Sequence, residues 1–498
     1  MKKLTHVKKA GKRSNYSIQD VVQMGNESED FVHCPVSTPH QQLWISFYKT
    51  LVDIKILHEL LLKELHTKPF QSLEEIKTCL TFESAEVTSK GDEALNMLLE
   101  GSVMVQLHRE DNEAILVPLL GEVKRDMTIP EIEFTVVGPK EAFIESLDAN
   151  IHLIRKRLFI PDLVVKELKV GKLTETKVAI IYIKSIANQD NVETMEQRIK
   201  DIDVDQLVDS STLGLMITGH TGSPFPEFLE TERPDRAVTA LAEGKVIALV
   251  NGSPQALIGP TTLVEFFSAF EDYFINWQLA TSLRLLRLFA VWFSIFSTPL
   301  YVAFLTYHVE LIPQDLLATL ILSRVIIPFP PILEVLLLEL TIELLREAGA
   351  RLPIKVGQTI GIVGGIVIGT AAVEAGLTSN VLLIIVALAA LASFTTPVYQ
   401  MGNTIRYLRF PFILAAELWG VISISLLFCV LLIHVLNLKS LGRPYLEPIY
   451  PPRLTDFKDS LLRLPLFFQT KRPKYLQVKD RQRYQMGKFK EINNDIDE

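Results

Sequence analysis

A carboxylate lies inside one of the most apolar stretches of this chain. The stretch is GQTIGIVGGIVIGTAAVEAGL, residues 357–377, and residues four apart on a helix stack on one face. One face of the predicted helix is polar at both ends and apolar in the middle: Gln358, Ile362, Ile366, Thr370 and Glu374. Acidic rings favour cations, and an apolar constriction can close a water path by dewetting. This spacing is suited to the passage of cations.

A second face of the same helix carries glycine at every fourth position: Gly357, Gly361, Gly365 and Gly369. In lipid, helices associate through close packing on small residues, so these glycines predict a helix contact. Copies packed in this way would surround a water path with Glu374 near one mouth. The hypothesis is a cation pore gated near Ile362 and Ile366. A packing role alone is the alternative for the glycine face.

Residues for catalysis or metal binding are not grouped along the chain. His152, His220 and His308 have no partners at ligand spacing, and the three cysteines show no paired spacing. The turn-rich TGHTGSP at 218–224 lacks the Lys-Ser/Thr of a phosphate loop. A formal net charge of −8 argues against a general nucleic-acid binder. We therefore expect no enzymatic activity, no catalytic residues, no cofactor and no metal.

The first half is predicted to be a soluble α/β region, because charged residues interrupt every apolar run up to about residue 283. Leu43, Phe47 and Leu51 have helical spacing and predict an amphipathic helix over 43–65. Alternating runs predict a hairpin over 102–120, with further strands at 177–186 and 245–258 on either side of a helix. A variable basic segment, 1–37, precedes subdomains 38–138 and 139–283, which are divided near Pro139. Because no apolar run follows the basic amino terminus, we expect the first half to be cytoplasmic.

The second half is predicted to be an all-α multi-pass membrane domain, 284–438, followed by a basic tail, 439–498. Runs long enough to cross a bilayer, which needs about 20 residues, or nearly so, lie at 288–309, 357–377, 381–398 and 410–438. A proline-broken segment around 315–353 is either a crossing or a re-entrant hairpin. Loop arginines fit five crossings, whereas the basic tail favours a cytoplasmic tail and an even number. The fold class is therefore α+β, with four or five crossings.

Several ionisable residues fall within these apolar segments: Arg324, Glu334, Glu339, Glu343, Glu374 and Glu417. An ionised side chain at mid-bilayer costs about 2.5–3.5 kcal/mol. We expect these side chains to face inward toward partners or water. The alternative is a position at the interface or a local pair, such as Glu343 with Arg346.

Long motifs in the second half closely resemble the A subunits of GerA-type spore germinant receptors. They are IPFPPILEVLLLELTIELLREAGARLP, GQTIGIVGGIVIGTAAVEAGLTSN, ASFTTPVYQMG and LRFPFILAA, with SPFPEFLETERPD upstream. The resemblance extends from about residue 138 to the tail. Two departures are Val137, where the family usually has arginine, and Thr50, where it usually has glycine.

The resemblance implies a multi-pass subunit of the inner spore membrane. Its partners would be a transporter-like B subunit, thought to bind the nutrient, and a lipoprotein C subunit. A pentameric ring of A subunits would form a ligand-gated channel for monovalent cations. In the TERPD motif, Glu232, Arg233 and Asp235 are expected to fix an interface by charged hydrogen bonds, or else to form a local surface ion pair that adds little stability. Alternatives are a membrane scaffold, a signal-amplifying sporulation protein of the same family, and a secondary transporter.

Overall fold

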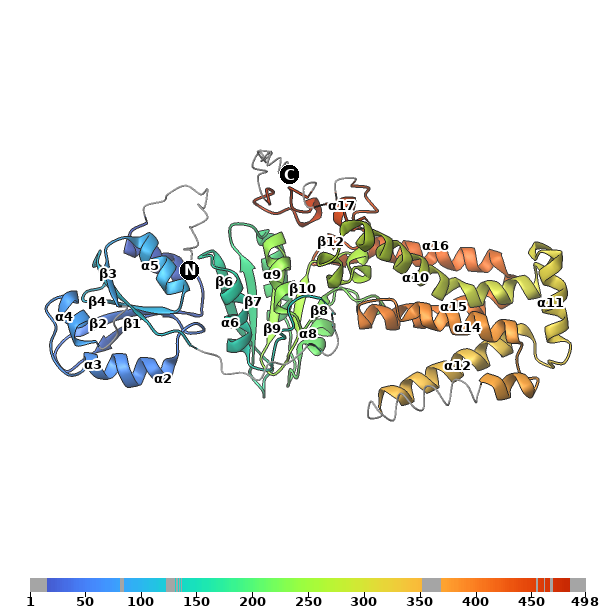
Figure 1. The fold of residues 1–498 in the computed structure, drawn as a ribbon, viewed down its shortest axis with the longest axis horizontal. Coiled ribbons are helices and arrows are strands. Elements are labelled where there is room, and N and C mark those ends of the chain that lie inside the picture. Colours follow the sequence, from blue (N-terminus) through green and yellow to red (C-terminus); the bar gives the residue numbers. More distant parts are fainter. Residues whose placement is uncertain are drawn as a thin grey trace, which may run out of the picture.

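The computed structural model contains two globular units followed by an elongated helical region (Figure 1). It describes residues 16–80, 85–121, 130, 133, 135, 137–351, 369–453, 456–460, 462–465 and 469–483. The helices of the second half extend away from the second unit, on the side opposite the first (Figure 1). An α/β region followed by a helical region is the order that the sequence predicts.

The first unit is a five-stranded antiparallel sheet in the order β1-β2-β4-β5-β3. Its strands are β1 (Phe31–Ser37), β2 (Gln42–Tyr48), β3 (Glu86–Thr88), β4 (Ser102–Gln106) and β5 (Ala114–Pro118). One face packs against α1 (Ile18–Gly25) and α5 (Gly91–Leu99). The other packs against α2 (Ile54–Ile56), the π-helical η1 (Leu57–Leu62), α3 (Lys63–Leu65) and α4 (Leu73–Cys79). The predicted hairpin is confirmed as β4 and β5, and the unit begins before residue 38 because β1 belongs to its sheet.

The segment 42–48 is strand β2, although the sequence pattern predicts a helix there. Leu43, Ile45 and Phe47 are all buried in the same core. Side chains two residues apart share a face of a strand, so the two-residue period decides which side chains are buried here. The helix prediction is wrong for 43–48 and holds for 54–65.

The second unit is another five-stranded antiparallel sheet, in the order β6-β7-β9-β10-β8. Its strands are β6 (Leu163–Val170), β7 (Thr176–Ile183), β8 (Leu229–Thr231), β9 (Val246–Val250) and β10 (Ala256–Gly259). Helices α6 (Leu147–Arg157) and α9 (Pro234–Glu243) cover one face. Helices α7 (Gln189–Lys200) and α8 (Ser210–Ile217) cover the other. The predicted strand at 177–186 and the helix after it are confirmed, and the predicted run at 245–258 forms two strands, β9 and β10.

The two units meet at a buried ion pair. Arg155 of α6 donates from Nε to Asp30 Oδ2 at 2.5 Å, and the two side chains are 1% and 0% exposed. The guanidinium also stacks on the ring of Tyr48 at 4.3 Å. Thr50, at the position where glycine is expected, donates to Asp30 at 3.0 Å, and its carbonyl oxygen lies 2.8 Å from Nδ1 of His152. Because a buried charge is costly without a partner, these contacts hold the two units together.

The helical region consists of α10 (Trp277–Thr306), α11 (Gln314–Arg324), α12 (Pro331–Ala350), α14 (Asn380–Ser393), α15 (Tyr399–Trp419) and α16 (Val421–Asn437). Helix α10 packs against α14, α15 and α12. Within the described residues, α10 has the length and apolar composition needed to cross a membrane, while α14 and α16 are apolar but shorter. The predicted run 410–438 is divided at Gly420, whose φ of +61° ends α15. That left-handed conformation favours glycine, and the chain reverses direction there.

The chain leaves the second unit through α10 and comes back to it at the end of α16. The short β11 (Lys439–Ser440) and β12 (Arg443–Pro444) follow α16 directly. The hydroxyl of Ser440 donates to the carbonyl oxygen of Glu227 at 2.7 Å. Further along, Arg472 donates to the carbonyl oxygen of Ala242 at 2.8 Å. The described part of the tail therefore lies on the same end of the helical region as the globular units (Figure 1).

Candidate functional site

The connection between the second unit and α10 is a cluster of charged residues, most of them buried, here called the junction: Asp272, Arg284, Arg287, Asp459 and Arg463. Two 3-10 turns, η2 (Leu263–Phe267) and η3 (Phe270–Tyr273), lead from the sheet to α10. Asn276 caps α10 by accepting from the backbone of Gln278. Arg284 and Arg287 lie on one face of α10, since residues three apart share a helical face, and both are buried.

Asp272 is the carboxylate that pairs with both arginines of α10. Its Oδ2 accepts from Arg284 Nε at 3.0 Å, and its Oδ1 accepts from Arg287 Nη2. Arg287 also donates to the carbonyl oxygen of Phe267 at 2.6 Å. Asp272 is only 1% exposed, so its charge is stabilised by these two guanidinium groups and not by water. The turn η3 and the start of α10 are thereby held in one geometry.

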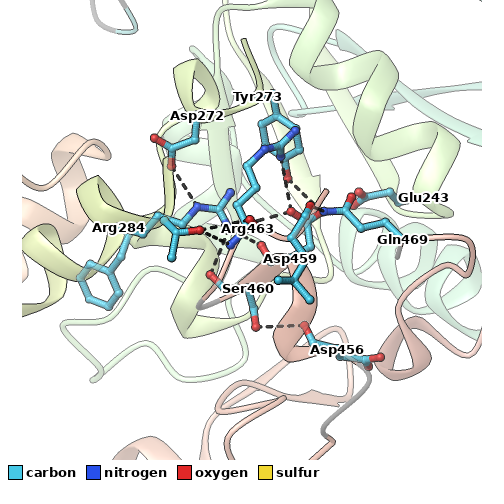
Figure 2. Close-up of polar contacts among 12 residues, drawn as sticks. Glu243, Asp272, Tyr273, Arg284, Asp456, Asp459, Ser460, Arg463 and Gln469 are labelled. Carbon is cyan, nitrogen blue, oxygen red and sulfur yellow. Dashed lines mark hydrogen bonds and ion pairs between the residues drawn. The ribbon is translucent and has the colours of Figure 1, made fainter. Parts of the chain in front are cut away.

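The carboxyl-terminal tail completes the junction through α17 (Phe457–Ser460). Arg284 donates to the carbonyl oxygen of Asp459, and the hydroxyl of Tyr273 donates to Asp459 Oδ2 at 3.4 Å (Figure 2). The guanidinium of Arg463 lies over the ring of Tyr273 at 4.0 Å. Burial raises the pKa of the Asp459 carboxyl and of the Tyr273 hydroxyl above their ordinary values. A segment some 180 residues away in sequence thus binds the start of α10.

Next to the junction, the tail also binds the second unit. The hydroxyl of Tyr475 donates to Glu265 Oε1 at 2.5 Å, and Arg483 donates to Glu243 Oε1 at 2.6 Å. Burial raises the pKa of the Glu243 carboxyl, and Arg483 opposes that shift. Glu243, Glu265 and Tyr475 border a cavity of about 110 Å³ whose lining also includes Tyr273. The tail, the second sheet and the connection to α10 therefore share one polar core.

Most of the predicted pore-lining and glycine face lies outside the described residues: Gly357, Gln358, Gly361, Ile362, Gly365 and Ile366. The described part is the helical turn that begins at Gly369. Gly369 is buried, and a Cβ there would lie 3.5 Å from Leu383 of α14. Thr370 and Glu374 are exposed. In this turn the glycine contacts a neighbouring helix, and the polar side chains point elsewhere.

The TERPD residues form a network within the chain. Arg233, which is 1% exposed, donates to Asp235 Oδ2 at 2.7 Å and to the carbonyl oxygen of Pro139 at 2.9 Å. Its guanidinium also lies 5.3 Å from the ring centre of Phe270, next to the junction. The backbone carbonyl of Glu232 accepts from Phe143 at 2.8 Å. The Arg233–Asp235 contact is a local ion pair, as the alternative expectation has it, but it is buried and not on the surface. The interface with another chain stays a prediction.

Among the described contacts, four of the six charges predicted inside the apolar segments form ion pairs. Arg324 pairs with Glu334 at 2.7 Å, and Arg409 pairs with Glu339 at 2.5 Å. Both glutamates are buried within the helical region, as predicted. Glu343 instead forms a local pair with Arg346, three residues on, at 2.6 Å, which was the alternative expectation.

Arg284 and Arg287 stand just before the first predicted span, but the sequence does not identify Asp272 and Asp459 as their partners. An aspartate shortly before two arginines at the start of an apolar run was the available signal for Asp272. Nothing near Asp459 in the sequence points to α10. Among the described residues, no three His, Cys, Asp or Glu side chains are grouped as a metal site.

The fold and the junction define a class of protein in which an α/β globular region is bonded to the first helix of an apolar helical domain. The family model described as Bacillus/Clostridium GerA spore germination protein matches residues 19–475. The chain is 49% identical to spore germination protein GerQA of Bacillus cereus over 94% of each chain. It is 47% identical to GerIA of Bacillus cereus over 91% of this chain and 68% of that relative. The chain belongs to the GerA spore germination protein family.

A solved structure is also similar to part of the chain. It is the N-terminal domain of the A subunit of the Bacillus megaterium spore germinant receptor GerK3, at 25% identity and a TM-score of 0.39. The match covers 50% of this chain and 98% of that one.

Proposed function

We propose that this chain is the A subunit of a nutrient germinant receptor in the inner spore membrane. Membership of the GerA family supports a role in spore germination. In the proposed complex the chain works with a transporter-like B subunit and a lipoprotein C subunit. Copies of the chain assemble as a pentameric ring around a path for monovalent cations. Opening of that path on nutrient binding releases cations and starts germination.

The observation that carries the channel proposal is the orientation of the turn after residue 369. Gly369 packs on Leu383 of α14, whereas Thr370 and Glu374 remain exposed in the single chain. An exposed carboxylate in an apolar domain needs water or a partner. A Cβ added at Gly376 would lie 3.4 Å from Ile326, which follows α11 directly. Helix α11 lies at the end of the helical region away from the globular units (Figure 1), so this turn is far from those units. Glu374 is therefore suited to the outer mouth of a path.

The direction of the chain supports an even number of crossings. Helix α10 begins and α16 ends at the second globular unit, and the tail hydrogen-bonds to that unit through Arg472. Both soluble parts then occupy one side of the membrane, the cytoplasmic side in our proposal. The multi-pass arrangement also gives the buried pairs of Arg324 and Arg409 a place away from lipid.

The test is ion flux in liposomes that contain the assembled receptor with its B and C subunits. Glu374→Gln is expected to lower the preference for K⁺ over Cl⁻ on the order of tenfold, because a ring of carboxylates sets cation selectivity. Ile366→Ala is expected to raise flux without nutrient. Glu310→Gln is the control, since Glu310 is also an exposed carboxylate and lies just after the carboxyl end of α10. Unchanged flux and selectivity in both Glu374→Gln and Ile366→Ala would refute the channel.

A further inference from the structure

A cavity lies where the second globular unit meets the helical region. Its walls are α8, the loop 218–228 that follows it, and the first turns of α15. It is here called the α8–α15 groove, and its volume is about 600 Å³. Small-molecule sites usually measure about 300–1,000 Å³ and often lie between domains. The groove therefore has the size and the location of a ligand site.

The loop that forms one wall of the groove is fixed by hydrogen bonds. The buried carboxylate of Glu227 accepts from the backbone N–H of Gly219 at 2.9 Å, which closes the loop on itself. The hydroxyl of Thr404, on α15, donates to the carbonyl oxygen of Pro224 at 2.5 Å, which joins the loop to the opposite wall. A site whose walls are already in place has little ordering entropy to lose when a ligand binds. The α8–α15 groove is thus pre-formed.

Two carboxylates line the described part of the groove, and they differ in their partners. Glu227 forms an ion pair with Arg198 at 3.6 Å. Glu230, which is half-buried, accepts from Ser211 Oγ at 3.3 Å, and among the described residues it pairs with no Lys or Arg. Burial raises the pKa of the Glu230 carboxyl, and hydrogen bonds from Gln400 and Ser211 oppose that shift. A partly buried carboxylate without a cation of its own is stabilised by a cation from outside the chain.

The remaining lining combines apolar surface with neutral polar groups. Leu215, Phe225 and Tyr407 supply apolar and aromatic surface, and Asn403 supplies an amide. The lining contains no Lys or Arg among the described residues, so an anionic ligand would meet Glu230 without a compensating charge. Aromatic rings also attract cations through their faces. These groups favour a small molecule that carries one ammonium group on an apolar body.

We propose that the α8–α15 groove binds a small organic ammonium compound, and that Glu230 is the residue that pairs with its ammonium group. The site belongs to this chain, whereas the nutrient site of the proposed receptor belongs to the B subunit. It does not depend on ion conduction. Because one wall is part of the globular unit and the other is α15, a bound ligand contacts both. Ligand binding is therefore expected to hold α15 more firmly against the second unit.

The test is the binding of phenethylamine to the full-length chain in nanodiscs, with amide hydrogen exchange as the readout. Phenethylamine carries an ammonium group on an apolar body, and 2-phenylethanol is a neutral molecule of similar shape. Phenethylamine is expected to protect both walls, residues 218–228 and 399–407, from exchange. The affinity of 2-phenylethanol is expected to be at least about tenfold lower, because hydrogen bonds to charged groups are stronger than those between neutral ones.

Three variants test the role of Glu230. Glu230→Gln removes the charge but keeps the shape, and should lower the affinity for phenethylamine at least about tenfold. Glu230→Asp keeps the charge and should retain part of that affinity. Glu193→Gln is the matched control, because Glu193 is an exposed carboxylate on α7, outside the groove, and its loss should leave the affinity unchanged. The comparison of the two probes uses the parent chain alone, so it is decisive even where a variant folds poorly.

Tighter binding of phenethylamine than of 2-phenylethanol, with protection of both walls that Glu230→Gln abolishes, would support the site. Equal affinity of the two probes for the parent chain would overturn it. So would protection that appears only outside residues 218–228 and 399–407. An unchanged affinity in Glu230→Gln, in a chain whose second sheet exchanges as slowly as in the parent, would overturn the role of Glu230.

Discussion

Replacement of Asp272 by asparagine is the sharpest perturbation of the junction. The change keeps the shape of the side chain but removes the negative charge that faces Arg284 at 3.0 Å and also binds Arg287. Breaking a buried ion pair typically costs about 3–5 kcal/mol. Both arginines keep backbone carbonyl acceptors, so the lower limit of about 3 kcal/mol is appropriate. At 1.36 kcal/mol for each tenfold change, the junction should open more than about a hundredfold more often.

Hydrogen exchange of the full-length chain in nanodiscs measures this opening directly. Amides of the connection at 262–275 and of the tail at 456–465 should exchange about a hundredfold faster in Asp272→Asn, as expected for local opening of that free energy. Glu271→Gln is the control, because Glu271 precedes Asp272 in the chain and its own side chain is partly exposed. Changes at such surface positions usually alter stability by no more than about 0.5 kcal/mol. Equal protection of both segments in Asp272→Asn and in the parent chain would refute the reasoning. Spores with the variant at normal receptor level should also respond more slowly to nutrient.

Two further predictions concern the globular units and the tail. Arg155→Ala leaves Asp30 buried without its cation, and should destabilise the contact between the two units by about 3–5 kcal/mol. Limited proteolysis of this variant should cut between the units. Lys49→Ala is the control, because it removes a more exposed ion pair and should cost at most about 1 kcal/mol. Burial raises the pKa of Glu243 and of Asp459 in the folded chain. Such groups add stability that is complete below the ordinary pKa and is lost as the pH rises through the raised pKa. Attachment of the tail to the second unit should therefore strengthen as the pH falls from 7 toward 4.5, the ordinary pKa of glutamate. The measurement is amide hydrogen exchange of residues 469–483, corrected for the intrinsic exchange rate at each pH. Weaker protection at the lower pH would contradict this expectation.

Local patterns predicted the elements wherever one period dominated. The alternation in β4 and β5 and the long apolar run of α10 both lead to the observed structure, because burial of one strand face or one whole helix is visible in nearby residues. The pattern misled at Leu43 and Phe47, where spacings of two and four coincide and only the third member, Ile45, reveals the strand. It also missed the division at Gly420, since glycine is common in membrane helices and its φ depends on the packing around it.

By itself, the sequence determined that the chain has a globular α/β part and an apolar helical part, and that ionised residues within the latter need partners. Composition and periodicity are properties of neighbouring residues in the sequence, so they can be read without knowing which distant segments pack together. Only the tertiary structure decided which partners these are: Arg409 for Glu339, 70 residues away, and a carbonyl of the tail for Arg284, 175 residues away. It also decided that the tail lies with the globular units. The pairing of distant charges depends on which helices become neighbours, and that is set by packing of the whole chain.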